Sequence, residues 1–328
     1  MLTTRAFLSA ACASGVVSLA GGFRSSAQAQ PVRGTARMLV GSIPGSATDA
    51  VARLLVSEMH DYAPAVVVEN RPGAGNRIAL DVSKGSVADG SVAVLTPASM
   101  LVIYPHIYRR LNYAVSDFTP VTTVCDVSFL LTIGPMVPAH VRTLPDFIAW
   151  CKANPGKASY GTPGAGSMLH FTGVMLARAA SFEFIHVPYP GPRVIQDLMG
   201  GQLPAAINTI GAALPHVQSG AVRALATTSP HRSPLLPGVP TFKELGYPEL
   251  EAVEWFGVFV PASTASEIVS KLNTAIHDAL KTRTVRSGLT KLSFEPAGCT
   301  PAEFRQLITS DLVQWGNVVQ TSGFKAED

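Results

Sequence analysis

Glycine-rich loops that lead into helices are the segments of this sequence best suited to chemistry. The run SYGTPGAGSMLH at 159–170 predicts a short strand, a loop with three glycines and a helix that begins at a hydroxyl residue. Such a helix start leaves backbone N–H groups without partners, and the helix dipole favours negative charge there. A loop of similar build, GSIPGSATD, occupies 41–49. Two such loops predict two lobes that close on one small anion.

The first loop combines turn residues with helix-starting residues. The functional interpretation is a carboxylate that rests on the N–H groups of residues 45–48, and the alternative is an ordinary capped turn between a strand and a helix. Its candidate binding residues are Pro44, Gly45, Ser46, Thr48 and Asp49.

The second loop has more glycine than capping alone requires, with three within residues 161–166. We expect its hydroxyl groups and the N–H groups of residues 164–167 to donate to a ligand. The histidine one turn into the helix either donates as well or packs. The candidates here are Thr162, Gly164, Gly166, Ser167 and His170.

Four further residues are candidates because of their places beside predicted strand ends. Ser99 follows the predicted strand 92–96, and Tyr189 and Asn208 follow or end later strands. Arg193 could grip a carboxylate with two hydrogen bonds, or could be a solvated arginine at a helix start.

The N-terminus predicts export. A short positive end, an apolar stretch at 6–22 and an A-x-A site form a secretory signal peptide over residues 1–29, with a membrane anchor as the alternative. Without Arg5 and Arg24 the formal charge falls from +3 to +1, so nucleic acid is not an expected partner. No later segment has the apolar length of a membrane span, so we expect a periplasmic protein.

Alternating strand and helix patterns predict an α/β fold with a largely parallel sheet. Strands are expected at 36–40, 65–69 and 92–96, with a helix from 49 to 59 and a long β-branched run at 121–135. A second α/β series follows the β-branched run, with a strand expected at 158–161, a helix at 193–199 and a strand at 205–209. We predict one lobe from residues 30–125 and 230–328 and a second from 126–229.

Other chemistries have weaker support in the residues. NRPGAGN at 70–76 lacks the third glycine and the later acidic residue of a dinucleotide site, so Asn70 and Arg71 are expected to fix a turn. Ser167 lies one position too late for a G-x-S-x-G hydrolase elbow. The histidines show no metal-ligand spacing, and we expect no cofactor or metal. Cys125, Cys151 and Cys299 allow at most one disulfide, and buried free thiols are the favoured alternative.

Several motifs in register carry a family resemblance over essentially the whole mature chain. Besides the 159–170 loop they are VVVENRPGAG (66–75), SDFTPV (116–121), HVPY (186–189), DLMGGQ (197–202), the run at 222–248, EWFGVFVPA (254–262) and the closing W-x-x-V-V-x-x-x-G-F-K (315–325). The chain resembles the periplasmic solute-binding proteins of the tripartite tricarboxylate transporter (TctC) family, the Bug receptors.

The resemblance implies a two-lobed type II periplasmic-binding-protein fold with a hinged interdomain cleft. It also implies a small organic carboxylate as ligand, no enzymatic activity, and delivery to a membrane permease of one large and one small subunit. We expect a monomer. A receptor of the same fold that signals to a sensor kinase is the alternative. Two positions depart from the family pattern, because Ser46 stands where a glycine is usual and Pro190 where a basic residue is usual.

Overall fold

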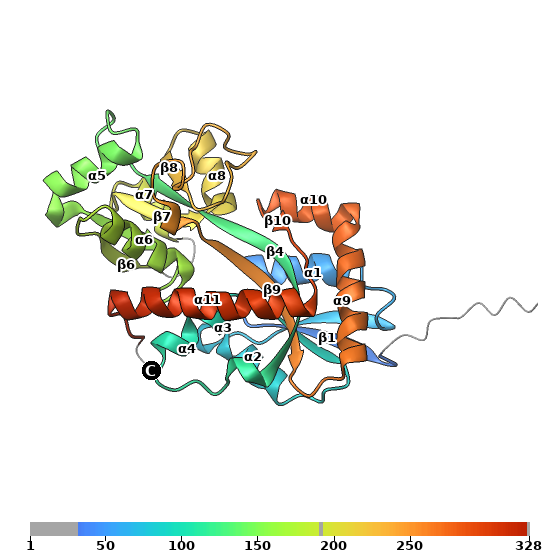
Figure 1. Cartoon of the computed structure of the whole chain (residues 1–328). Coiled ribbons are helices and arrows are strands. Elements are labelled where there is room, and N and C mark those ends of the chain that lie inside the picture. The colour runs from blue at the N-terminus through green and yellow to red at the C-terminus, as the bar shows by residue number, and fades with distance from the viewer. Residues whose placement is uncertain (1–31, 190–192, 327–328) are drawn as a thin grey trace, which may run out of the picture.

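A single mixed β-sheet runs through the protein (Figure 1). The computed structural model describes residues 32–189 and 193–326, so the predicted signal peptide at 1–29 and Pro190 lie outside the described residues. The strand order is β2-β1-β3-β9-β4-β7-β5-β6, and β8 and β10 also pair with β4. The strands are β1 (Thr35–Val40), β2 (Ala65–Asn70), β3 (Val92–Pro97), β4 (Phe118–Ile133), β5 (Ser159–Thr162), β6 (Ile185–Pro188), β7 (Ala205–Thr209), β8 (Arg223–Thr227), β9 (Val253–Pro261) and β10 (Glu295–Pro296).

Helices pack around this sheet and connect its strands. They are α1 (Ala47–Val56), α2 (Arg77–Lys84), α3 (Ser99–Val102), α4 (Tyr104–Ile107), α5 (Leu144–Ala153), α6 (Met168–Ala179), α7 (Arg193–Met199), α8 (Ile210–Gln218), α9 (Ser266–Lys281), α10 (Arg283–Lys291) and α11 (Pro301–Ser322). Short 3₁₀ segments lie at Ala74–Asn76, Val115–Asp117, Pro155–Lys157 and Pro248–Leu250. None of the helices in the described residues is long and apolar enough to cross a membrane.

The long strand β4 belongs to two halves of the sheet. Its residues from Phe118 to Ser128 pair with β9, whereas those from Phe129 to Ile133 pair with β7 and β8. We call the half with β1, β2, β3 and β9 the first lobe and the half with β5, β6, β7 and β8 the second lobe. A second crossing lies beside the first, because Thr228 N donates to Phe129 O and Ala252 N donates to Thr228 O. The residue boundaries predicted for the two lobes stay a prediction.

The sheet is mixed, and the expectation of a largely parallel sheet was wrong in this respect. Strands β1, β2 and β3 are parallel to one another, as are β5, β6 and β7. Strands β4 and β9 run antiparallel to their neighbours because they carry the chain from one lobe to the other and back. The carboxyl ends of the parallel strands in each lobe therefore lead into the two glycine-rich loops.

The C-terminal helix α11 contacts both lobes. It packs against α3 and α4 of the first lobe and against α6 of the second, and Figure 1 shows it lying across the molecule. Trp255 and Phe256 on β9 are buried in apolar packing, and the indole N–H of Trp255 donates to Asp311 of α11 at 2.7 Å. The two rings meet those of Phe304 and Phe294 edge-on, so they pack inside the protein.

Several elements differ from their sequence expectations. The helix expected at 49–59 is α1, and the segment after β3, expected to be a loop, forms the short helices α3 and α4. Helices α8 and α10 were not expected, although each begins after a threonine whose hydroxyl caps it: Thr209 accepts from Ala212 N and Thr282 accepts from Val285 N. The three cysteines are free thiols, but Cys299 is only half-buried, so the expectation of burial was wrong for it.

Candidate functional site

Asp49 organises the first loop from within. Its side chain is 2% exposed and accepts hydrogen bonds from Gly45 N at 2.8 Å, Arg53 Nε at 2.9 Å and Asn70 Nδ2 at 2.9 Å. Burial alone would raise the pKa of Asp49, but these donors outweigh it and lower the pKa to about 2. Asn70 Nδ2 also donates to Ser42 O at 3.0 Å, which agrees with its expected role in fixing this turn.

The internal role of Asp49 changes which donors the first loop can offer. Gly45 N, expected to face a ligand, is engaged by Asp49, and Ser46 N donates to Ile43 O. The hydroxyl of Ser46 caps α1 by accepting from Asp49 N at 3.3 Å. Within the described residues, the N–H groups of Ala47 and Thr48 have no protein acceptor, as expected for the first turn of a helix. These two amides are the donors that remain.

The hydroxyl groups of the second loop are also used internally. Thr162 Oγ1 donates to Gly164 O at 3.0 Å, and it therefore accepts from His186 Nε2 at 2.8 Å. Ser167 Oγ donates to the same carbonyl at 2.8 Å and accepts from His170 N at 3.3 Å. In this conformation each hydroxyl hydrogen already has a protein acceptor, so donation from these hydroxyls to a ligand stays a prediction.

Two of the three glycines in this loop have structural reasons of their own. A side chain at Gly161 would lie 2.6 Å from Leu203 and Val194, and Gly166 has a φ of +73°. Gly164 has neither constraint, since nothing lies within 4 Å of where its Cβ would be. Gly164 is therefore the glycine whose openness is compatible with close approach of a ligand.

His170 is a packed residue. It is 4% exposed, its ring stacks on His186 with centroids 3.9 Å apart, and Nδ1 accepts from Gly166 N at 3.2 Å. Burial, with the nearby His186, lowers the pKa of His170 to about 3, and burial lowers the pKa of His186 to about 4. Both rings are neutral near pH 7, and the packing alternative describes His170. Ser167 and His170 form no nucleophile–base pair, because the imidazole nitrogen next to the loop bonds to an amide.

Ser99 joins the two lobes. It begins α3 in the first lobe, and its hydroxyl accepts from Met168 N at the start of α6 in the second lobe, at 3.4 Å. The same hydroxyl donates to Glu254 Oε1 at 2.5 Å. Sequence reasoning gave Glu254 no role; the signal available was a carboxylate that interrupts the apolar strand VEWFGVFVP.

Asn208 is the second-last residue of β7, and its side-chain amide is a buried donor. It is 1% exposed, and within the described residues its Nδ2 atom has no hydrogen-bond partner. A buried amide without a partner costs free energy, so a ligand oxygen that accepted from it would gain the full value of the bond.

The remaining two candidates lie at the same end of the second lobe. Tyr189 N donates to Thr162 O at the end of β5, and its ring packs over Gly161. Arg193 opens α7 as an exposed residue. Of the two alternatives for Arg193, exposure fits the solvated helix-start residue.

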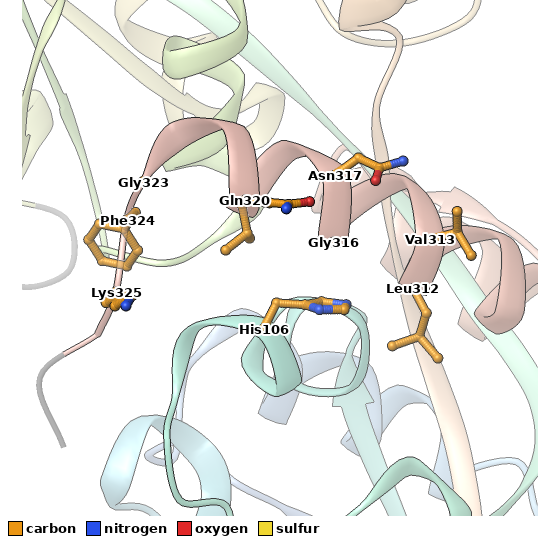
Figure 2. Close-up of a pocket in the computed structure, with 10 residues that line it drawn as sticks. His106, Leu312, Val313, Gly316, Asn317, Gln320, Gly323, Phe324 and Lys325 are labelled. Atoms are coloured by element: carbon orange, nitrogen blue, oxygen red, sulfur yellow. The ribbon is translucent and has the colours of Figure 1, made fainter.

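A separate groove lies between α4 and α11. Its volume is about 740 Å³, and its lining includes His106 and the C-terminal residues Phe324 and Lys325. Figure 2 shows His106 reaching from α4 toward Gly316 on α11. Neither glycine-rich loop lines the groove. Phe324, which does line it, also contacts the helix that follows the second loop: its ring meets that of His170 edge-on with centroids 4.8 Å apart.

Known proteins of similar sequence cover nearly the whole chain. The sequence matches the family described as "Tripartite tricarboxylate transporter family receptor" over residues 51–324. It is 35% identical over 305 residues to Protein BugT of Bordetella pertussis, covering 92% of each chain.

Solved structures resemble the fold described above. Rpa4515 of R. palustris, determined with adipate, superposes with a TM-score of 0.79 at 29% identity and covers 90% of this chain and 99% of its own. MatC of Rhodopseudomonas palustris, with bound malate, gives a TM-score of 0.73 at 28% identity, covering 88% and 99%. With a family match from residue 51 to residue 324, the chain belongs to the tripartite tricarboxylate transporter receptor family.

Proposed function

We propose that the protein is a periplasmic receptor that binds a carboxylate group of a small organic acid between its two lobes. The observation that carries this proposal is the set of unused donors at the start of α1 and near the end of β7. Ala47 N and Thr48 N begin α1 in the first lobe, and Asn208 Nδ2 is buried without a partner in the second. The family relatives with adipate and malate support the ligand class.

The second glycine-rich loop adds backbone donors to this set. Within the part of the chain that the structure describes, Gly164 N, Ala165 N, Ser167 N and Leu169 N have no protein acceptor. Each hydrogen bond to a charged group contributes roughly 1.5–3 kcal/mol, and a micromolar site needs about 8 kcal/mol. Four to six of these donors reach that value after association costs. Amides from both lobes contribute, so closure of the lobes completes the site.

The proposed site selects for a carboxylate by amide donors and not by a salt bridge. The ion pair of Arg53 with Asp49 at 2.9 Å is internal to the first loop, and Arg193 is exposed. The residues that we propose to line the site are the candidates of the two loops together with Ser99, Tyr189 and Asn208, whereas Arg193 is a solvated residue at the start of α7. Direct contact is assigned to backbone amides in the loops, with their hydroxyl groups as loop-shaping residues.

Delivery to a membrane permease of one large and one small subunit is the transport role that we propose with this site. Residues 1–29 would direct export and be removed, leaving a periplasmic monomer. A receptor that signals to a sensor kinase would use the same site, and neighbouring genes for a permease or a kinase would separate the two roles. A serine hydrolase is disfavoured because the hydroxyl of Ser167 donates to a carbonyl, Gly164 O.

Thermal unfolding of the mature protein (residues 30–328), stripped of bound ligand by unfolding and refolding, tests the proposal. The panel contains mono-, di- and tricarboxylates, amino acids and aromatic acids. A ligand at one hundred times its dissociation constant adds about 2.7 kcal/mol of stability, a shift of several degrees. A folded, stripped protein that responds to no carboxylate would contradict the proposal.

Two asparagine variants separate binding from folding. Asn208→Ala removes a donor without a protein partner, so we expect the Kd of the carboxylate to rise by about tenfold or more while stability is retained. Asn273→Ala removes hydrogen bonds to Val121 O and Cys299 O, both 2.9 Å, far along the chain from the loops. We expect this control to lose stability and keep its Kd. The reverse pattern would refute the place we give Asn208.

A further inference from the structure

A chain of hydrogen bonds crosses between the lobes at the start of α6. Glu254 Oε1 on β9 accepts from Ser99 N at 3.3 Å and from Ser99 Oγ at 2.5 Å. Ser99 Oγ in turn accepts from Met168 N at 3.4 Å. Glu254 and Ser99 belong to the first lobe and Met168 to the second, so the last of these bonds exists only while the lobes are together.

The residues of this hydrogen-bond chain are buried. Glu254 is 8% exposed, Ser99 1% and Met168 0%. Burial raises the pKa of Glu254, and the two hydrogen bonds from Ser99 act in the opposite direction. Within residues 32–189 and 193–326, no lysine, arginine or histidine forms an ion pair with this carboxylate. The titratable groups near it are Tyr104 and Cys125, whose pKa values are raised by burial with a contribution from Glu254.

Helix α6 supplies the electrostatic support that Glu254 otherwise lacks. The helix spans 12 residues, and its positive N-terminal end faces the Ser99 hydroxyl that bonds to Glu254. A carboxylate that accepts from a hydroxyl also makes that oxygen a stronger acceptor, which strengthens the bond from Met168 N. Separation of the lobes would remove this support and leave Glu254 with Ser99 alone.

We infer that Glu254 and Ser99 are positioning residues that hold the lobes closed before a ligand arrives and so set the affinity of the site. This inference rests on the proposed function. Ser99 fixes the first amide of α6, and the adjacent amides of Ser167 and Leu169 are donors that we assign to the ligand. Apparent affinity is the intrinsic affinity reduced by the fraction of receptor that is competent to bind, so a smaller closed population raises Kd in proportion.

Apolar contacts at the same junction accompany the hydrogen-bond chain. Gly166 lies so close to α4 that a Cβ there would be 2.6 Å from Ile107 Cδ1. Phe324, just beyond α11, meets the rings of His170 and Phe171 edge-on. These apolar contacts favour closure of the two lobes but do not fix their relative orientation. The hydrogen bond from Met168 N to Ser99 is directional, so it specifies the position of the start of α6.

Small-angle X-ray scattering of the stripped, ligand-free protein tests the inference directly. We expect a compact wild-type protein and a larger radius of gyration for Ser99→Ala, because the bond between the lobes is lost. Glu254→Gln keeps an oxygen for Ser99 but removes the charge, so an intermediate radius is expected. Tyr62→Phe is the matched control: it removes a buried hydroxyl bond to Gly90 O, 2.8 Å, inside the first lobe, and should leave the radius unchanged.

Ligand affinity provides the second readout. The Kd of the carboxylate found in the thermal panel should rise by about tenfold in Ser99→Ala and less in Glu254→Gln, and Tyr62→Phe should keep the wild-type value. The inference is overturned if the radius of gyration of Ser99→Ala equals that of a compact wild type. It is also overturned if the ligand-free wild type is already as extended as this variant. If Ser99→Ala fails to fold, Glu254→Gln decides, and an unchanged radius again overturns it. Expansion of Ser99→Ala in a protein that binds no carboxylate would support the role of Ser99 in closure while refuting the proposed function and the effect on affinity.

Discussion

Replacing Asp49 by asparagine should destabilise the protein in a pH-dependent way. The carboxylate is 2% exposed and holds Gly45 N, Arg53 Nε and Asn70 Nδ2 together, so it fixes the first loop in one conformation. Its pKa is lowered from 3.8 to about 2. A difference of about 1.8 pH units corresponds to about 2.4 kcal/mol of stability at neutral pH.

The sign follows from the direction of the shift. A folded-state pKa below the unfolded value gives stability that is fully present above about pH 4 and is lost as the pH falls toward 2. At pH 3 about half of the 2.4 kcal/mol remains. Asp49→Asn should therefore lower Tm by about 4 °C at pH 7 and by about half as much at pH 3.

Differential scanning calorimetry at several pH values measures this difference. Asp278→Asn is the matched control, because Asp278 is 63% exposed and its ion pair with Lys281 lies at the surface. We expect that control to change stability by less than about 0.5 kcal/mol at either pH. Equal losses in the two variants, or a loss in Asp49→Asn that does not vary with pH, would refute the role given to Asp49.

Three further predictions concern residues outside the loop donors. Burial and nearby carboxylates raise the pKa of Asp126 to about 6, so wild-type stability should fall as the pH rises from 4 to 6. In urea unfolding at pH 7.5, Asp126→Asn should therefore be more stable than the wild type by up to about 3 kcal/mol. Gly166→Ala forces a side chain into a φ of +73° and should cost about 1–2 kcal/mol and weaken carboxylate binding, read by calorimetry. The guanidinium of Arg223 donates to four carbonyls within 134–141, and Arg223→Met should cost about 2–4 kcal/mol in the same urea assay. The role given to Asp126 would be contradicted if Asp126→Asn were no more stable than the wild type at pH 7.5. The roles given to Gly166 and Arg223 would be contradicted if their variants kept wild-type stability.

Local patterns in the sequence were enough to predict most of the second lobe's elements. The helix expected at 193–199 matches α7, and the strand expected at 205–209 matches β7. Apolar periodicity and turn residues are local signals, so they survive without knowledge of the fold. The antiparallel course of β4 and β9 depends on pairing between residues more than one hundred positions apart, such as Thr123 with Gly257, which no local pattern contains.

The same limit applies to the hydrogen bonds that the candidate site residues form inside the protein. Residue types in the two glycine-rich loops identified Ser46, Thr162 and Ser167, but a hydroxyl in such a loop can bond within the loop as readily as to a ligand. Only the fold shows that the Thr162 and Ser167 hydroxyls donate to Gly164 O and that Asp49 takes the N–H of Gly45. The role of Glu254 depends on Ser99, 155 positions away, and so could not be inferred from spacing.

A crystal structure of the stripped mature protein with the carboxylate that binds it most tightly would show which atoms hold the ligand. We expect one carboxylate group between the lobes, with oxygens within about 3.2 Å of amides that begin α1 and α6 and of Asn208 Nδ2. A carboxylate bound instead in the groove between α4 and α11, with the loop amides and Asn208 unchanged, would contradict it.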